Sequence, residues 1–287
     1  MSDYLSNVKD LPVMPEVAAK ILGLGSGAGE ISFTQLEEII KVDVGLTAKI
    51  LKIANSALYA RQREISDLRT AITMLGFKNI KTLVLLVTAS GLFHHIRKTS
   101  FYQDFWRHSI VTAVIGQDLA TRHPGRASRD EMFLAGILHE IGQPVLFIAE
   151  RERYPEVLEL AGSDAAALEE LEQQRFSVDH RSLGADLLRG WNFPSLYVDI
   201  AAQSGSVAID SPHKTTILIV TISSILAAKL GYGSLRQDAD SLLQELMPRA
   251  NVGADTISYY TDSFGPTMME QDLVRTTFEM FAIKAGG

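Results

Sequence analysis

His139 and Glu140 stand side by side in a setting that could support chemistry. They lie in a run of apolar residues typical of a core helix. Gly136 precedes the pair and Gly142 follows it. Small residues around an imidazole allow another helix, a ligand or a metal ion to approach closely. The pair is therefore a candidate ligand position, although a single His-Glu pair is a weak signal by itself.

Two further histidines have comparable surroundings. His180 is followed one turn later by Gly184, and His108 follows Asp104 by four residues, a spacing that predicts an imidazole oriented by the carboxylate. With Glu140, the histidines predict ligands drawn from several helices, as metal-assisted hydrolysis requires, because a metal ion lowers the pKa of bound water. The alternative is that each histidine is a buried, hydrogen-bonded core residue, and spacing alone favours that alternative.

Other catalytic classes are disfavoured. The chain has no cysteine, which excludes a disulfide framework, thiolate metal ligands and a cysteine nucleophile. It also lacks the Gly-x-Ser-x-Gly and His-Glu-x-x-His motifs. The glycine-rich segment 23–29 follows a helical pattern and lacks the Lys-Ser/Thr of a phosphate-binding loop, so it predicts a flexible loop.

The composition is that of a globular protein. Of the 287 residues 46% are apolar, and the net charge of −7 disfavours a general nucleic-acid binder. No secretory signal is visible, and the apolar stretches at 83–93 and 217–230 fall short of the roughly 20 residues of a membrane span. We therefore expect a cytoplasmic protein with no nucleic-acid partner and no membrane partner.

Helical periodicity dominates and predicts an all-α fold. Thr34, three residues before Glu37, predicts a capping box at the start of a helix. Thr215–Ile225 is rich in β-branched residues and could form a strand, but its length and the alanines that follow favour a helix. The predicted helices cover about residues 69–75, 79–96, 101–122, 129–143, 154–161, 164–175, 179–189, 194–203, 212–230, 235–246 and 269–283.

Weak boundary signals near residues 97–99 and 231–234 predict three parts that pack as one body. Residues 5–97 form an N-terminal helical lobe, residues 98–232 a central lobe, and residues 233–287 a C-terminal helical extension. The extension has an apolar face, which packs back on the body or forms a homodimer, made of Leu235, Leu242, Leu243 and Leu246.

Several motifs, in order along the chain, resemble the HDOD domain, a relative of the HD-type metal-dependent phosphohydrolases. They are LPVMPEVA at 11–18, DVGLTAKILKIANSA at 43–57, FWRHS at 105–109, LAGILHEIG at 134–142, DHRSLG at 179–184 and WNFP at 191–194. The resemblance covers about residues 5–232, with 98–232 as the HD-like lobe. It implies a multi-helix bundle that serves as a bacterial signal-transduction module, such as the output domain of a response regulator.

The resemblance also implies where a catalytic relative would hold its metal ligands: a first histidine, a His-Asp dyad, later histidines and a final aspartate. The corresponding positions are His108, His139, Glu140, His180, Gln203 (with its neighbour Ser204) and, within one or two residues, Ser224.

Departures from that pattern predict loss of catalysis. Glu140 keeps a carboxylate that is one methylene longer, Gln203 is a poorer ligand than imidazole, and Ser224 removes an anionic ligand. Loss of a ligand or of its orienting partner commonly costs about 10–100-fold in affinity or activity. We therefore expect a vestigial pocket without a metal ion or other cofactor.

The sequence thus predicts a non-catalytic regulatory protein, a pseudoenzyme that contacts signalling proteins. A candidate interaction patch is the turn of Asn55, Ser56 and Tyr59, unless Asn55 caps the helix and Tyr59 packs. A second hypothesis is a phosphohydrolase or phosphodiesterase that acts on nucleotides or cyclic dinucleotides with a divalent transition metal. A third is binding of a small-molecule ligand in the pocket without turnover.

Overall fold

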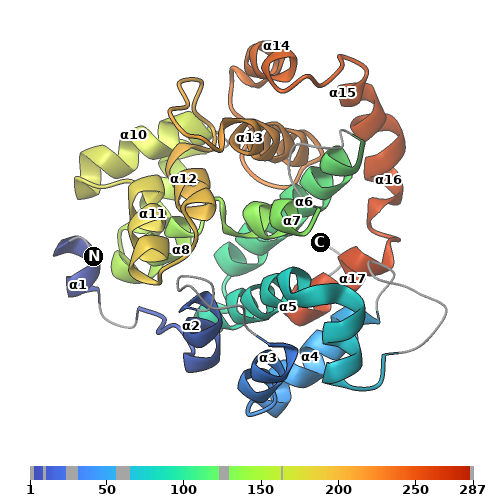
Figure 1. The fold of residues 1–287 in the computed structure, drawn as a ribbon. Helices are drawn as coiled ribbons and strands as arrows, with labels where there is room; N and C mark the ends of the chain where they lie inside the picture. Colours follow the sequence, from blue (N-terminus) through green and yellow to red (C-terminus); the bar gives the residue numbers. More distant parts are fainter. Residues whose placement is uncertain are drawn as a thin grey trace. The chain divides into compact units, whose positions relative to one another are not determined.

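The computed structural model describes residues 3–8, 11–23, 32–55, 65–122, 129–162 and 164–284. All regular structure in those residues is helical, which confirms the predicted all-α fold (Figure 1). Contacts between residues divide the chain into two units. The histidine unit comprises Met1–Leu11 with Lys98–Thr267, and the N-terminal unit comprises Pro12–Arg97 with Met268–Gly287. The predicted C-terminal extension of 233–287 is therefore shared between the two units.

The N-terminal unit is built around its longest helix, α5. This helix packs against α2, α3 and α4, while α17 packs against α4, where Lys52 pairs with Glu279 at 2.6 Å. Gly76 has non-helical backbone angles, φ 81° and ψ 165°, so it interrupts α5 at the break that the sequence predicts between residues 75 and 79. The bounds are α2 Glu16–Gly23, α3 Phe33–Ile40, α4 Val44–Ala54, α5 Leu68–Leu92, a 3-10 turn His94–Ile96, and α17 Asp272–Met280.

The predicted cap of the second helix is wrong by two residues. Ser32, not Thr34, is the N-cap of α3, because its hydroxyl accepts the Gln35 backbone N–H while the Gln35 side chain accepts the Ser32 N–H. Both patterns fit a capping box in the sequence, and the helix begins at the pair whose two side chains each accept the backbone N–H of the other residue.

The histidine unit has a core of three helices, in which α6 packs against α7 and α13 (Figure 1). Helices α11 and α12 pack together, α11 lies against α8, and α14 covers α13. The bounds are α1 Asp3–Asn7, α6 Ser100–Arg122, α7 Arg129–Leu138, α8 Gly142–Ala149, α9 Tyr154–Ala161, α10 Ala165–Phe176, α11 His180–Gly190, α12 Ser195–Gln203, α13 Lys214–Lys229, α14 Ala239–Arg249, α15 Thr256–Ser258, a π-helix Tyr259–Phe264, and α16 Gly265–Met268.

Helix α13 settles the ambiguity of the β-branched segment 215–225 in favour of a helix. Nearly all of its side chains are buried, and its hydroxyl groups bond to carbonyls one turn earlier. Thr221 Oγ1 donates to Ile217 O at 2.9 Å and Ser223 Oγ donates to Ile219 O at 2.7 Å. Such bonds satisfy polar groups inside an apolar core without a partner from another helix.

The predicted single helix over 129–143 is wrong, because the chain turns at His139–Ile141 and separates α7 from α8. Gly142 begins α8 directly against α11: a Cβ atom on Gly142 would lie 1.8 Å from the carbonyl oxygen of His180. The turn brings α8 close to α11. It also places His139 and Glu140 between two helices, outside any helix interior.

The predicted start of the helix near residue 235 is also wrong, because α14 begins at Ala239. The residues before it form a strap, residues 231–238, in which Gly231 and Gly233 have positive φ and Arg236 pairs with Asp238 at 2.9 Å. In α14, Leu242, Leu243 and Leu246 are buried and the helix packs on α13, as one of the two expected roles of this face required.

Two segments, Leu68–Leu92 and Glu131–Ala149, are long and apolar enough to cross a membrane by length and composition alone. Burial within the protein covers 56% and 78% of their apolar windows, as in the core helices of many folds. The expectation that the protein has no membrane partner stays a prediction.

Candidate functional site

A cavity of about 520 Å³ lies within the histidine unit and brings the candidate residues together. Helices α6, α11 and α13, the turn between α7 and α8, and the strap 231–238 all contribute to its lining. Of the positions that the sequence singled out, the cavity is lined by His108, His139, Glu140, His180 and Ser224.

His108, on α6, is fixed through both of its ring nitrogens. Nδ1 lies 2.7 Å from the carbonyl oxygen of Tyr232 in the strap, and Nε2 lies 3.1 Å from Ser224 Oγ on α13. Because a carbonyl oxygen only accepts, Nδ1 carries the proton and Nε2 has the free electron pair. The prediction that Asp104 orients this imidazole is wrong, since Asp104 pairs with Arg107 at 3.4 Å.

His139 is held in the same way by the main chain. Its Nδ1 donates to the carbonyl oxygen of Gly136 at 2.8 Å. Its Nε2 is buried and has no hydrogen-bond partner among the described residues. Burial lowers the pKa of His139 to about 4, so the imidazole is neutral and offers an electron pair at Nε2.

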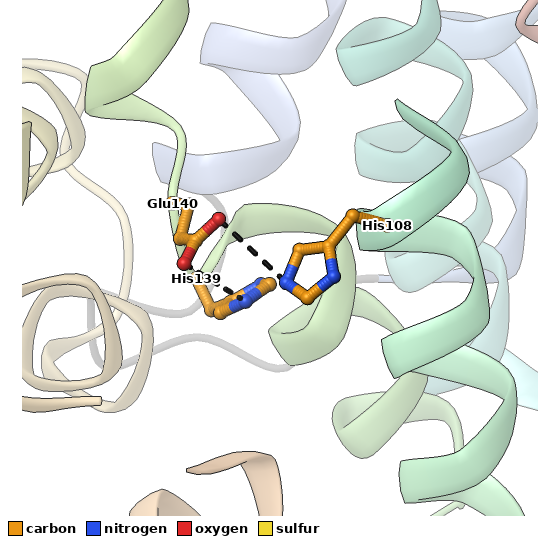
Figure 2. Close-up of side chains that lie close together, drawn as sticks. All are labelled: His108, His139 and Glu140. Carbon is orange, nitrogen blue, oxygen red and sulfur yellow. Dashed lines mark ion pairs between the residues drawn. The ribbon is translucent and has the colours of Figure 1, made fainter. Parts of the chain in front are cut away.

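Glu140 faces both of these imidazoles from the turn after α7. Figure 2 shows the carboxylate beside both rings, with a dashed line to each. Oε2 lies 3.7 Å from His108 Nε2, and Oε1 lies 3.7 Å from His139 Nε2. Burial alone would raise the pKa of Glu140, but the neighbouring histidines and Arg181 outweigh it and lower the pKa to about 2. The carboxylate is therefore ionised.

His180, the first residue of α11, is held by a buried carboxylate. Its Nδ1 lies 2.6 Å from Glu172 Oε2, which also accepts the His180 backbone N–H at 2.9 Å, and Tyr154 donates its hydroxyl to Glu172 Oε1 at 2.6 Å. Burial lowers the pKa of His180, but the Glu172 carboxylate outweighs this and raises it. Its Nε2 is buried without a partner among the described residues.

Sequence reasoning missed Glu172. The residue is fully buried on α10, a helix that also carries Glu169 and Glu170. Nothing in the local pattern separates the buried glutamate from the other two. A signal would have needed the partner helix: the backbone N–H of His180 and the Tyr154 hydroxyl reach Glu172 from elements outside α10.

The donor set fits a divalent transition metal in part. The ligand atoms of His108, His139 and Glu140 all lie within 4.8 Å of one another, and two imidazoles with one carboxylate are a set that such metals accept. The unpartnered Nε2 of His139 supports the fit. A metal held there would polarise a phosphoryl oxygen and acidify a water molecule.

The charge balance is poor, however. Glu140 is the one anion in this three-residue cluster, and Ser224 stands where the resemblance implied an aspartate. The Ser224 hydroxyl lies within hydrogen-bond distance of His108 Nε2, the ring nitrogen that would bind the metal. A dication with a single carboxylate keeps an uncompensated charge in a buried site.

Gln203 does not line the cavity, which corrects the predicted pocket. Its amide exchanges two hydrogen bonds with the backbone of Asp210, at 3.2 and 2.8 Å. The neighbouring residue, Ser204, faces the cavity instead: its Oγ accepts from Arg181 Nη1 at 3.1 Å and donates to the carbonyl oxygen of His139 at 3.4 Å. Helix α12 ends at Gln203, and Ser204 has extended backbone, so the position that points inward moves by one residue.

Only Asn55 of the candidate interaction patch can be described, because Ser56 and Tyr59 lie outside the described residues. The Asn55 side chain donates to the carbonyl oxygens of Leu51 and Ile65 and accepts the Ile65 N–H at 2.8 Å. Its amide therefore ties the end of α4 to the start of the next described segment. The role of the patch in binding stays a prediction.

The chain resembles a known family in sequence and several solved structures in fold. A family model described as "HDOD domain" matches residues 11–206. An HDOD domain protein with unknown function from Geobacter sulfurreducens superposes with a TM-score of 0.75 at 18% identity, covering 98% of this chain and 97% of the other. A provisionally assigned phosphohydrolase from Shewanella amazonensis superposes with a TM-score of 0.72 at 22% identity, covering 96% and 98%. At these identities the likeness concerns the fold.

Two curated relatives match by sequence. An uncharacterised protein of Treponema pallidum is 22% identical over 187 residues, which are 65% of this chain and 36% of the relative. A protein of Vibrio cholerae named "Cyclic di-GMP phosphodiesterase CdgJ" is 27% identical over 143 residues, which are 50% of this chain and 32% of that protein. The matched region thus spans about a third of the length of these relatives.

Proposed function

Since the chain belongs to the HDOD domain family, we propose that it is a non-catalytic signal-transduction protein that acts through contacts with partner proteins. The fold resembles that of a provisionally assigned phosphohydrolase, and the histidine unit holds a cavity lined by the candidate ligand residues. Under this proposal the cavity serves the shape and regulation of the protein and carries out no phosphoester hydrolysis.

The observation that carries the proposal is the contact between Ser224 and His108. A hydroxyl group lies 3.1 Å from the Nε2 atom of the first candidate metal ligand, at the position where an anionic ligand would be needed. Metal ions that activate water in hydrolases are bound by several donors whose negative charge offsets the cost of desolvation. Glu140 supplies only part of that charge.

A hydrolysis assay tests the proposal directly. The full chain is incubated with bis(p-nitrophenyl) phosphate and with cyclic di-GMP in the presence of Mn²⁺, Fe²⁺ or Zn²⁺, beside a known phosphodiesterase. We expect no turnover above that of the metal ion alone. Turnover that the His139→Ala variant abolishes would overturn the proposal.

One set of observations favours a second function, a metal-dependent phosphodiesterase. Two imidazoles and an ionised carboxylate converge. In addition, a protein whose sequence matches half of this chain is named a cyclic di-GMP phosphodiesterase. Metal analysis of protein purified without added metal separates the two functions. One equivalent of bound metal together with turnover supports the enzyme, and metal-free inactive protein supports the regulator.

The partner side of the proposal is tested by capture. Tagged full-length chain and its Tyr59→Ala variant are used to recover proteins from a lysate of the source cells. Loss of a partner in the variant would support the patch that includes Asn55 and Tyr59, and an unchanged partner set would remove this patch from the proposal.

A further inference from the structure

His180 lines the cavity and has one ring nitrogen without a hydrogen-bond partner among the described residues. Its Nδ1 is engaged by Glu172 at 2.6 Å, whereas Nε2 is buried and without a partner among the described residues. The side chain is 2% exposed and lines the cavity. Nearly all buried polar atoms in proteins have a hydrogen-bond partner, so this nitrogen calls for a ligand atom.

Two arginines line the same cavity. Arg181, the residue after His180, donates to Ser204 Oγ at 3.1 Å and to Glu169 at 2.6 Å. Arg236, in the strap, donates to the carbonyl oxygen of Gly205 at 3.3 Å and pairs with Asp238. Each guanidinium carries five N–H donors, more than these bonds use. Arginines in such positions recognise phosphate and carboxylate groups.

Two acidic side chains, Glu140 and Asp104, line the cavity within the described residues, and the Glu140 carboxylate also interacts electrostatically with His180 and Arg181. Glu140 is turned toward His108 and His139 (Figure 2), and Asp104 pairs with Arg107. His180 and Arg181 also begin α11, and the first turn of a helix favours negative charge.

We propose that His180, Arg181 and Arg236 form a subsite for a small oxyanion, phosphate or a phosphomonoester, and that buried Glu172 is the residue that positions His180 for it. The oxygens of both ligands accept from guanidinium N–H groups, and inorganic phosphate also keeps an O–H at neutral pH that can donate to the imidazole nitrogen. The inference goes beyond the proposed function, because binding of an oxyanion requires no turnover.

Glu172 acts through its three bonds. It accepts from His180 Nδ1 and from the His180 backbone N–H, and it receives the Tyr154 hydroxyl, so the imidazole cannot rotate to place Nδ1 in the cavity. Because α10 carries three glutamates in different surroundings, the Glu→Gln substitution can be made at each of them and its effect on binding compared. Glu172 is buried behind His180, Glu169 binds Arg181, and Glu170 is exposed.

The test is calorimetric titration of inorganic phosphate into the full chain, freed of metal with a chelator and held at constant ionic strength. Glu172→Gln should weaken phosphate binding by about tenfold, because a charge-assisted bond that holds His180 is lost. Glu169→Gln should tighten it, because Arg181 loses a competing carboxylate. Glu170→Gln should leave it unchanged.

Nitrogen NMR of the imidazole rings supplies a readout that a purely structural role of Glu172 would not move. Phosphate should shift the His180 Nε2 signal in the parent chain and in Glu170→Gln, with a smaller shift in Glu172→Gln. If Glu172→Gln does not fold, Arg181→Gln and Arg236→Gln carry the test, and each should weaken binding.

Three results would overturn the subsite: no saturable binding of phosphate, equal affinity in Glu172→Gln and Glu170→Gln, or binding that occurs only after a metal ion is added. The last would assign phosphate to the cluster of His108, His139 and Glu140. None of these results bears on hydrolysis, so failure of the subsite and failure of the proposed function remain distinguishable.

Discussion

Histidines on two sides of one cavity are held by opposite means. His108 and His139 donate their Nδ1 protons to main-chain carbonyl oxygens and have the Glu140 carboxylate in front of Nε2. His180 has its carboxylate, Glu172, behind it on Nδ1, and Arg181 is the next residue. The first arrangement suits a cation and the second suits an anion. The residue type alone therefore does not fix what an imidazole binds; the charged groups near its free nitrogen, Glu140 on one side and Arg181 on the other, make the difference.

The largest effect that separates the two sides is expected from removal of the buried carboxylate. Glu172→Ala leaves the Tyr154 hydroxyl, the His180 imidazole and the His180 N–H without their partner, and should lower the free energy of unfolding by about 3 kcal/mol. Glu140→Ala, the matched change in front of the other histidines, should cost about 1 kcal/mol, because Glu140 has few hydrogen bonds to lose. Urea denaturation of both variants measures the difference, and equal losses would contradict the comparison.

A smaller effect is expected in the strap that holds His108. A Cβ atom on Gly233 would lie 2.4 Å from His108 Nδ1, and its φ is +108°. Gly233→Ala should therefore cost about 2 kcal/mol and move the His108 ring nitrogens in the NMR spectrum.

Gly231→Ala is the control for the strap. This glycine also has positive φ, but no atom lies within 4 Å of its added Cβ, so the change imposes backbone strain without contact with His108. An identical imidazole spectrum in both variants would show that the strap does not position His108.

The cation side can be sharpened by restoring the missing charge. Ser224→Asp places a carboxylate beside His108 Nε2 and should tighten the binding of Mn²⁺ or Zn²⁺ by about tenfold, as measured by calorimetry. Ser234→Asp, which adds the same charge to the cavity lining on the exposed strap, should have little effect. Equal gains in both variants would mean that net charge alone controls affinity.

The smallest effect is expected at Asp104. Asp104→Asn should change the free energy of unfolding by less than about 0.5 kcal/mol, since the carboxylate is 68% exposed and its pair with Arg107 lies at the surface. The His108 nitrogen signals should not move. A change of tautomer at His108 would restore the role that helical spacing first suggested for this carboxylate.

The helices and the three histidines were predictable because their signals are local. Periodicity placed α6, α9 and α13, and the motifs around His108, His139 and His180 predicted that these residues meet in one pocket. The register of Gln203 failed by one residue, since the end of α12 depends on the extended backbone of Ser204. The break between α7 and α8 failed because it depends on the approach of α11 to Gly142, which no local pattern records.

Glu172 and Tyr232 were not predictable for a related reason. Glu172 differs from Glu169 only in what α10 packs against, and Tyr232 acts through a backbone atom that every residue type possesses. Partners of this kind follow from tertiary structure. Sequence reasoning therefore found the imidazoles and missed what orients them.

The use of main-chain acceptors has a consequence for sequence drift in this cavity. The carbonyl oxygen of Tyr232 remains in place whatever side chain stands at position 232, so mutations there would leave the tautomer of His108 intact. The tautomer of His180 depends on one side chain, and a single codon change at position 172 would rewire that side of the cavity alone. A substitution at position 172 can thus change what the His180 side of the cavity binds, while the surroundings of His108 and His139 stay as they are.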